Sequence, residues 1–449
     1  MLVLANYYIH GMVLERIKIM NNTIKTTDST ITKLIQKEHK RQEENINLIA
    51  SENYADPAVL AVQSSVLTNK YAEGYPTKRY YAGCQFIDEI EQHAIDLAKE
   101  LFNTEHANVQ PHSGSQANMA LYNALLKPGD TILAMNLSAG GHLTHGHHVN
   151  FSGTFYNIVH YGVNRTTELI DYDEVTALAE QHKPVLIVAG ASAYSRIIDF
   201  KKFKEIADAV GAFFAADIAH IAGLIAADLH PSPVSHADVI SSTTHKTLRG
   251  PRGGLLLSNA SLKEKIDRAV FPGSQGGPLM NTIAAKAVAF RLALSQDFAD
   301  YQRRIIQNAK SMATAFKNRG YRIVSDGTDN HLFIVDLQSK GCTGRDAENL
   351  LDQVGITVSR SCIPFDPQRP WITSGIRVGT PAITTRGFTG SECEQIVELV
   401  DTTLSHADNQ KKLDTIGVKV RELALARPIY DNQTLIPDTK TPLITLNQP

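Results

Sequence analysis

The feature that most constrains the fold is an alternation, from about residue 85 onward, of amphipathic helix-length segments with short apolar runs. Segments 85–102 and 200–211 carry apolar residues at helical spacing. Apolar runs of strand length lie at 131–135, 184–190, 213–217, 237–246 and 254–259. Strands that are apolar throughout are typical of a mainly parallel sheet covered by helices on both faces. We therefore expect an α/β fold.

The last third of the chain follows a different pattern. It predicts one long helix over 295–320, a strand over 331–337, a helix over 344–355 and a strand over 356–361. This is a smaller α+β unit, and we expect the boundary of a small C-terminal domain (297–449) near residue 297. The large domain would span 65–296.

The N-terminal part predicts an arm over residues 25–64. Residues 29–50 favour a polar helix that starts near Asp28, Ser29 and Thr30, and a helix this polar could lie on a partner subunit. We expect residues 1–24 to be a disordered tail, or upstream sequence read through from a wrongly chosen start.

Charge and cysteine content exclude several classes of protein. The chain has 44 basic and 46 acidic residues, so it lacks the broad positive field that nucleic acid or an anionic membrane demands. The apolar residues near the N-terminus are too few to span a bilayer and lack the basic segment of a secretory signal. Four separated cysteines without a C-x-x-C pair favour a reducing compartment, and we expect a cytoplasmic protein. The four histidines in 142–148 have no carboxylate or thiolate nearby, so no metal is expected.

Three polar segments beside apolar runs carry the chemistry. Small residues at 111–118 open a helix, where free N–H groups bind a phosphate or simply cap the helix. Asp217 ends an apolar strand, on the side where open parallel sheets bind ligands, and its carboxylate suits a protonated pyridine nitrogen or an ordinary cap. Lys246 closes another strand, 29 residues on, and is placed for a Schiff base with an aldehyde cofactor or for solvent. Their combination favours the cofactor. The glycine-rich turns at 250–254 and 272–278 allow close approach of a ligand or a neighbouring subunit, or are only tight loops.

Nine strings carry a resemblance to a known family. In chain order they are LIASENY, LTNKYAEGYPTKRYYAG, PHSGSQAN, GGHLTHG, DIAHIAGL, TTHKTLRGPRGG, SQGGPLM, GTDNHLF and TSGIRVGTPA, from about residue 45 to 385. Here the chain resembles the serine hydroxymethyltransferases. The resemblance implies the fold-type I architecture of enzymes that use pyridoxal 5'-phosphate, with an N-terminal arm, a large domain around a mainly parallel seven-stranded sheet, a smaller C-terminal domain and a homodimer with shared active sites.

The resemblance also implies roles for residues around the cofactor. Lys246 would hold pyridoxal phosphate as a covalent aldimine, with Thr243 and His245 beside it controlling its release. Asp217 would pair with the ring nitrogen, and His142 would stack on the ring. Further cofactor contacts would come from Ser192 and His220 to the phenolic oxygen, from Ser113, Gly114 and Ser115 to the phosphate, and from Tyr71, Gly276 and Gly277 of the other subunit.

On the substrate side, the resemblance implies that Arg377 binds the amino acid carboxylate, with Ser51 assisting and Tyr81 lining the pocket. Glu73, from the other subunit, would be the acid and base for the serine hydroxyl and the folate. Tetrahydrofolate, as cosubstrate, would lie against Tyr80, Leu137, Gly141, His142 and Leu143, with Ser361 and Trp371 as further candidates.

The sequence departs from the family pattern in one loop. Where the family reads N-S-V-P-N-D-P, this chain has Ser361-Cys362-Ile363-Pro364-Phe365-Asp366-Pro367. The first asparagine of that pattern contacts the folate pterin, and a serine hydroxyl cannot present the same donor and acceptor pair. Ser274, Asn281 and the pair His147-His148 are further departures.

Three functions follow as hypotheses. The first is a serine hydroxymethyltransferase that interconverts L-serine and glycine with tetrahydrofolate, favoured by Glu73, Tyr80 and Tyr81. The second is a related enzyme, an α-methylserine hydroxymethyltransferase or a folate-independent β-hydroxy amino acid aldolase, favoured by the altered loop. The third is a non-catalytic role such as RNA binding, which the near-neutral charge and the complete catalytic set disfavour.

Overall fold

The computed structural model describes residues 26–430, so the predictions for residues 1–24 and for the end of the 297–449 segment lie outside the described residues. Its main sheet has seven strands in the order β4-β10-β9-β8-β7-β5-β6. β10 runs antiparallel to both of its neighbours, and the other pairs are parallel. The strands are β4 (His106–Asn108), β5 (Thr131–Met135), β6 (Asn157–Tyr161), β7 (Leu186–Ala189), β8 (Phe213–Asp217), β9 (Val239–Thr243) and β10 (Gly254–Ser258). The predicted fold class is confirmed.

Both faces of this sheet are buried, which explains its continuous apolar runs. In β5, Leu133 and Met135 belong to one apolar core and Ile132 and Ala134 to another, because successive strand residues point to opposite faces. α4 (Gln85–Phe102), α8 (Phe200–Val210) and α11 (Met280–Ala293) supply residues to the first core. α5 (Gly114–Leu125) and α10 (Lys263–Val270) cover the second.

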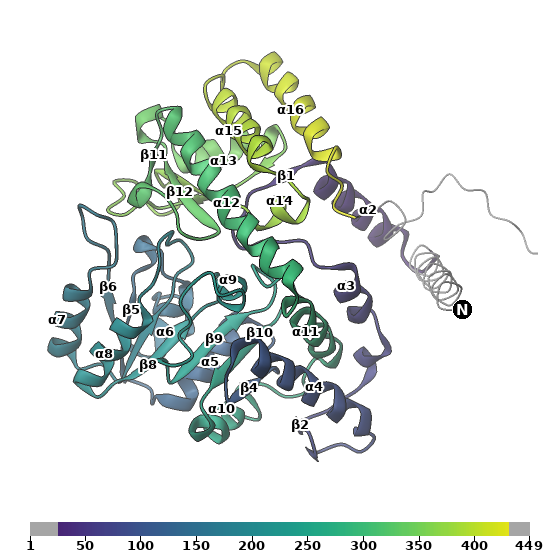
Figure 1. Cartoon of the computed structure of the whole chain (residues 1–449), viewed down its shortest axis with the longest axis vertical. Coiled ribbons are helices and arrows are strands. Elements are labelled where there is room, and N and C mark those ends of the chain that lie inside the picture. The colour runs from purple at the N-terminus through teal and green to yellow at the C-terminus, as the bar shows by residue number, and fades with distance from the viewer. Residues whose placement is uncertain (1–25, 431–449) are drawn as a thin grey trace, which may run out of the picture.

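A second, antiparallel sheet has the order β11-β12-β15-β14 and its own apolar core. Its strands are β11 (Arg322–Ile323), β12 (Leu332–Asp336), β14 (Ser359–Ser361) and β15 (Gly375–Gly379), covered by α12 (Gln296–Asn318), α13 (Gly344–Gln353), α15 (Gly390–Leu404) and α16 (Gln410–Leu425). α12 joins the two cores, with Phe298 and Tyr301 in the first and Met312 and Phe316 in the second (Figure 1).

The N-terminal helix is shorter than the sequence predicts. α2 (Ser29–Glu44) begins at the Asp28 cap, but the predicted extension to residue 50 is wrong. Ile46 and Leu48 are fully buried, and Ile46–Asn47 forms strand β1, which pairs with β13 (Ile356–Thr357). Burying these side chains in the small core requires an extended chain at that point. β13 and β14 likewise divide the single strand predicted over 356–361.

α2 lies against α16 beside the small sheet (Figure 1). The buried Arg386 guanidinium ties the two together, because it donates to the carbonyls of Glu43 in the last turn of α2, of Asn45 just after α2 and of Arg427 after α16. The arm then continues through α3 (Pro57–Gln63), which packs on α11.

The remaining elements connect these parts. They are η1 (Val66–Asn69), β2 (Gly74–Tyr75), β3 (Lys78–Arg79), η2 (Leu137–Ala139), η3 (Leu143–His145), α6 (Phe151–Phe155), α7 (Tyr172–His182), α9 (Ala222–Ala226), η4 (Ala260–Leu262), η5 (Val324–Asp326), η6 (Gln338–Lys340) and α14 (Pro381–Thr385). Among residues 26–430, no helix combines the length and the apolar character that crossing a bilayer requires.

Candidate active site

A cavity of about 540 Å³ lies beyond the carboxyl ends of the parallel strands. Its lining includes fifteen of the residues that the sequence analysis singles out: Ser51, Ser113, Gly114, Ser115, Leu137, Gly141, His142, Leu143, Ser192, Asp217, His220, Thr243, His245, Lys246 and Arg377. Segments from more than three hundred residues of chain thus converge on one site.

Lys246 lies three residues after the end of β9 and is buried. Its ammonium nitrogen makes no hydrogen bond or ion pair with any described residue. Burial lowers the pKa of Lys246 to about 8, and the Arg377 and Arg252 guanidinium groups act in the same direction, while the Asp217 carboxylate opposes them. An unpartnered amine with a lowered pKa is a nucleophile poised for an aldehyde.

Asp217 is the last residue of β8, and its carboxylate is held from several sides. Oδ2 accepts hydrogen bonds from Asn118 Nδ2 (2.9 Å) and His145 Nε2 (3.1 Å), and Oδ1 accepts one from the Ala219 N–H (3.0 Å). Burial alone would raise the pKa of Asp217, but the His145 and Asn118 hydrogen bonds hold it below its usual range. A fixed carboxylate therefore faces the cavity.

Sequence reasoning assigned no role to Asn118 or His145. Both stand inside quoted strings, PHSGSQAN and GGHLTHG, but only the fold brings them to one carboxylate. Asn118 Nδ2 also donates to Thr144 Oγ1 (2.8 Å), so one network joins α5, η3 and the end of β8.

The N-terminus of α5 forms the end of the cavity that suits an anion. Ser113 caps the helix through its Oγ, which accepts the Gln116 N–H. The Gly114 and Ser115 N–H groups have no hydrogen-bond partner among the described residues, as expected at a helix start. A Cβ at Gly114 would stand 2.6 Å from Thr243 Cγ2, so a side chain there would disturb the strand that leads to Lys246.

Two residues behind this loop were not predicted. Lys286, fully buried on α11, donates to the carbonyls of Val109 (2.6 Å), Pro111 (3.0 Å) and Gly254 (2.8 Å). The Gln275 side chain accepts from the His112 N–H and donates to the Gln110 carbonyl. Together they fix the backbone that leads into the α5 N-terminus. A lysine in an apolar helix and a glutamine in a glycine-rich turn offered no local signal of this.

Two histidines face the cavity as neutral rings. Burial lowers the pKa of His142 to about 4, and its Nδ1 lies 2.8 Å from Thr144 Oγ1. The pKa of His220 lies well below its ordinary value because the ring is buried, with Lys246 and Arg377 next in effect. Neutral rings can pack on or hydrogen-bond an aromatic ligand without adding charge.

Arg377, on β15 of the small sheet, is the cation on the opposite side. Its Nη1 donates to the Ser192 carbonyl (2.7 Å), and its buried Nε has no partner within residues 26–430. Burial lowers the pKa of Arg377 to about 10, so the group stays charged at neutral pH. A buried guanidinium with a free donor suits a carboxylate, which accepts two parallel hydrogen bonds.

Across the described residues, no three histidine, cysteine or carboxylate side chains are grouped to hold an ion. Within the histidine-rich segment, His142 and His145 serve the networks above, and His147 and His148 pack ring to ring at 4.5 Å.

The comparison with known families decides what this site is. A family model described as serine hydroxymethyltransferase matches residues 24–400, most of the chain. The chain belongs to the serine hydroxymethyltransferase family. It is therefore a fold-type I, pyridoxal-phosphate-dependent transferase of one-carbon metabolism.

The residues of the cavity fit the cofactor that this family uses. An aldehyde, a phosphate and a pyridine nitrogen need an amine, an anion site and a carboxylate. Lys246, the α5 N-terminus and Asp217 supply these three, and all three groups have unused bonding capacity. A further free donor, Arg377 Nε, remains for a substrate.

The other residues that the family resemblance assigns lie apart from this cavity. Glu73 and Tyr80 line a shallow pocket with residues 271–276, and Tyr71 packs on Tyr81 at 4.9 Å between ring centroids. A Cβ at Gly277 would meet the Tyr71 ring at 3.1 Å, so this group forms one cluster. Tyr71, Tyr80 and Tyr81 are exposed.

A buried ion pair holds this second cluster in place. Arg79, on the β2–β3 hairpin, donates to Asp88 (2.8 Å) and Glu91 (2.7 Å) of α4 and to the carbonyls of Ala72 and Gly74. The hairpin is therefore fixed to α4. Glu73 precedes this hairpin and Tyr80 and Tyr81 follow it, although their side chains have few partners in the same chain.

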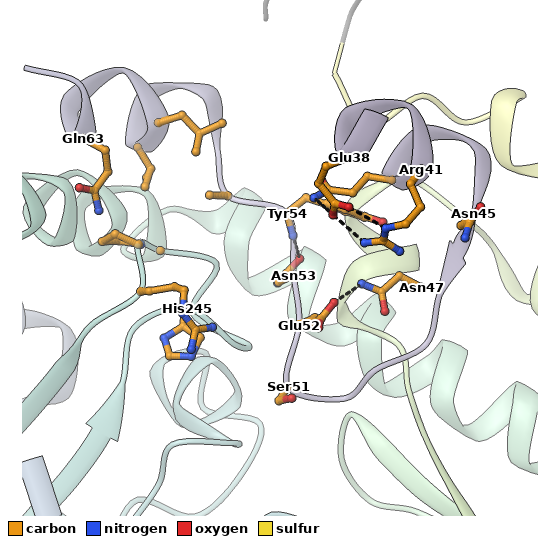
Figure 2. A pocket seen from close by; sticks show the side chains of 17 residues that line it. Glu38, Arg41, Asn45, Asn47, Ser51, Glu52, Asn53, Tyr54, Gln63 and His245 are labelled. Atoms are coloured by element: carbon orange, nitrogen blue, oxygen red, sulfur yellow. Dashed lines mark hydrogen bonds and ion pairs between the residues drawn. The ribbon is translucent and has the colours of Figure 1, made fainter. Parts of the chain in front are cut away.

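A second cavity of about 490 Å³ lies beside the first and shares Ser51, Glu52, His245 and Arg252 with it. Figure 2 shows Glu38 and Arg41 of α2 on one side of it, His245 on the other, and Ser51 on the segment between them. Glu38 pairs with Arg41, and Glu52 accepts from Asn47 Nδ2. The cofactor cavity is thus open toward the N-terminal arm.

The loop that departs from the family pattern lies outside the main cavity. Neither Ser361 nor Trp371 is among its lining residues, and Ser361 Oγ donates to the Cys362 carbonyl (3.1 Å). Phe365 has a left-handed backbone (φ 56°), and Arg165 stacks on its ring at 4.1 Å. Cys362 and Pro364 line a small void together with Ser138–Gly140, next to Leu137.

Proposed function

We propose that this protein is a glycine hydroxymethyltransferase, which interconverts L-serine and glycine and passes the one-carbon unit to tetrahydrofolate, giving 5,10-methylenetetrahydrofolate. The observation that carries the proposal is the convergence of Lys246, Asp217, the α5 N-terminus and Arg377 on one cavity, in a chain of this family.

The residues around the cofactor would divide the work as follows. Lys246 would hold the aldehyde carbon, and its lowered pKa keeps a useful fraction of the amine neutral near pH 8. Asp217 would keep a proton on the ring nitrogen. When bound, pyridoxal phosphate supplies an electron-withdrawing ring that stabilises negative charge at the substrate α-carbon. Ser113, Gly114 and Ser115 would bind the phosphate, and His142 would cover one ring face.

The substrate carboxylate would bind Arg377, with Ser51 nearby in the same cavity. Arg377 is also held by the Ser192 carbonyl, so its planar fork is oriented before the substrate arrives. Thr243 and His245, which both precede Lys246 closely in the sequence, line the cavity and would help to control release of the lysine amine. Orientation of this kind lowers the entropic cost of reaching the reactive geometry.

The proposal includes a homodimer with shared sites. Glu73, the acid and base for the serine hydroxyl, and Tyr80 and Tyr81 belong to a cluster separate from their own chain's cavity. A second copy would bring its Tyr71, Glu73, Tyr80, Gly276 and Gly277 to the cofactor of the first. The cavity beside Ser51 and His245 gives such a segment room to enter (Figure 2).

Mixing two inactive variants tests this arrangement. Lys246→Ala and Glu73→Gln each remove one contribution, and a mixed dimer with sites shared between subunits retains one intact site of two. Random exchange of equal amounts should then recover about a quarter of wild-type activity. If the mixture recovered no activity, Lys246 and Glu73 would act within one chain, and the proposal of active sites shared between subunits would be wrong. A mixture of Lys246→Ala with a Lys246→Ala, Glu73→Gln double variant is the control and should stay inactive.

The loop at 361–367 supports a second candidate function. Ser361 and Phe365 stand where the family pattern has asparagines, and the Ser361 hydroxyl is already bonded within its own loop. This favours an α-methylserine hydroxymethyltransferase or a folate-independent β-hydroxy amino acid aldolase. In either case the compartment we propose is the cytoplasm, with small amino acids as ligands and neither nucleic acid nor membrane as partner.

One titration separates the two candidates. Glycine is added to the purified holoenzyme, tetrahydrofolate follows, and the visible spectrum is recorded after each addition. A new long-wavelength band that depends on folate supports the proposed function. A glycine response with no folate response, together with faster cleavage of α-methylserine than of L-serine, would move the assignment to the second candidate.

A further inference from the structure

A pair of buried histidines joins the two lobes directly behind the cofactor cavity. His220 follows β8, three residues after Asp217, and His331 immediately precedes β12 of the small sheet. His220 Nδ1 lies 3.2 Å from His331 Nε2, and the side chains are 5% and 0% exposed. His220 lines the cavity; His331 stands behind it and does not.

Both rings are neutral, so His220 Nδ1 and His331 Nε2 share a single hydrogen bond in which one nitrogen donates its proton and the other accepts it. Burial and the neighbouring cations Arg377 and Lys246 lower the pKa of His331 to about 3 and that of His220 well below its ordinary value. Two neutral imidazoles can form this hydrogen bond in two ways, with the proton on either nitrogen, and each choice fixes the tautomer of both rings.

The environment of His331 decides between the two arrangements. His331 Nδ1 is buried and has no partner among the described residues. If His220 Nδ1 donated the bond, His331 would carry its own proton on that isolated Nδ1. If His331 Nε2 donates, only a lone pair is left isolated. Buried N–H groups without a partner are rarer in proteins than acceptors with unused capacity, so the second arrangement is favoured.

The same choice determines whether His220 Nε2 carries a proton. With Nδ1 accepting from His331, the His220 proton sits on Nε2, which has no hydrogen bond to residues 26–430 and belongs to the ring that lines the cavity. We propose that His331 is a positioning residue, whose Nε2–H holds His220 in the tautomer that donates an N–H into the cavity, toward an anionic oxygen of the bound cofactor ring.

This inference rests on the proposed function for the identity of the ligand, but the tautomer exists without it. Nitrogen NMR of histidine-labelled apoprotein, with His220→Asn used to assign the signals by difference, reads it directly. We expect the His220 resonances of an Nε2–H tautomer. An Nδ1–H tautomer in the apoprotein would overturn the proposal.

A matched pair of variants tests the consequence for the cofactor. In His331→Gln the side-chain amide keeps a donor near the Nε2 position, whereas His331→Met fills the space without one. We expect pyridoxal phosphate to bind His331→Met about tenfold more weakly than wild type, and His331→Gln within about threefold of it. The pH at which the visible band of the holoenzyme titrates should shift upward in His331→Met and return toward the wild-type value in His331→Gln.

The cofactor assignment and the role of His331 can be overturned separately. If none of the proteins binds pyridoxal phosphate, the proposed function fails while the tautomer measurement still stands. If both His331 variants bind the cofactor as wild type does, or if the glutamine behaves as the methionine does, the positioning role is overturned and the proposed function is untouched. Thermal unfolding of both variants checks that weaker binding does not reflect a loss of folded protein.

Discussion

The cofactor half of this site and the half that we propose for folate are built in opposite ways. Around the cofactor cavity, Asp217, His142 and Arg377 are only partly exposed, and each makes a hydrogen bond of 2.7–2.9 Å within the chain. On the folate side, Tyr80 and Trp371 are 75% and 56% exposed, and Ser361 bonds only its own loop. Most of the cofactor half lies in one cavity of a single chain, whereas the other half is distributed over exposed loops.

This difference shows where function can vary. A buried network tolerates little change, because an unpaired buried polar group costs roughly 1–3 kcal/mol. An exposed loop tolerates substitution with small effects on stability. The departures from the family pattern at Ser361 and Phe365 stand in the exposed half, as this reasoning expects. Substitutions in the cofactor half should therefore have larger effects on stability and activity than substitutions in the exposed half.

The largest effect is expected from Lys246→Met. Loss of the amine should reduce activity to the background of the assay, yet the free energy of unfolding of the apoprotein should rise, by about 1–3 kcal/mol at neutral pH. The reason is that the folded-state pKa of about 8 lies below the unfolded value, so keeping this ammonium buried costs stability below pH 8. That cost disappears as pH rises toward 10. Chemical denaturation at pH 7 and pH 10 measures both values, and a fall in stability at pH 7 would contradict the assignment of Lys246 as an unpartnered cation.

Lys286→Met should have the reverse effect on stability. The Lys286 side-chain nitrogen donates to three buried carbonyls, so its removal leaves them without this partner. Burial lowers the pKa of Lys286 to about 7, so the cost of burying its charge is largely gone at pH 10, where Lys286→Met should lower the free energy of unfolding by about 3 kcal/mol. Chemical denaturation of the apoprotein measures the free energy of unfolding of both Lys286→Met and Lys246→Met. Each variant therefore serves as the control for the other, because both lysines are buried near the cofactor cavity. Equal changes in the two variants would show that burial, and not hydrogen bonding, sets their contributions.

The sequence predicts the cofactor half well because local pattern and position in the fold coincide there. Asp217 and Lys246 close or follow apolar strands, and the carboxyl ends of such strands share one edge of the sheet. The loop that leads into α5 is likewise readable as a helix start. Lys286, Gln275 and His331 could not be found this way, because their partners lie far away in the sequence and nothing near them marks a polar contact.

The rest of the prediction failed or stays open for reasons of tertiary structure. The helix expected over 29–50 ends at Glu44 because Ile46 and Leu48 are drawn into the small core, which propensity does not show. Strands β4, β6 and β15 were not predicted; β4 is only three residues long. The domain boundary near 297 stays a prediction, since α12 contributes to both cores. The roles of Glu73, Tyr80 and Tyr81 stay predictions because their proposed targets lie on another chain.

A pH dependence should mark the cofactor half. Only the neutral amine of Lys246 captures the aldehyde, so the rate of reconstitution of apoenzyme with pyridoxal phosphate should fall about tenfold for each pH unit below 8 and level off above it. Because the Asp217 carboxylate raises the pKa of Lys246, Asp217→Asn should move this break to lower pH. Stopped-flow absorbance measures both profiles. A break near pH 10, the value of an exposed lysine, would mean that Lys246 is not desolvated in solution.

The smallest effect is expected in the exposed half, in the 361–367 loop. The double variant Ser361→Asn, Phe365→Asn restores the amides of the family pattern and places asparagine, which tolerates φ 56° well, where phenylalanine now stands. One regained hydrogen-bond pair should lower the KM for tetrahydrofolate by about three- to tenfold. The rate of folate-independent cleavage of a β-hydroxy amino acid should not change, because the loop does not line the cofactor cavity. The single variant Phe365→Asn also releases the stack with Arg165, and therefore separates the loss of that contact from the gain of the Ser361→Asn amide. If the double variant instead slowed folate-independent cleavage as much as it altered the folate KM, the loop would be acting on the cofactor half, and the division between a fixed and a variable half would not hold.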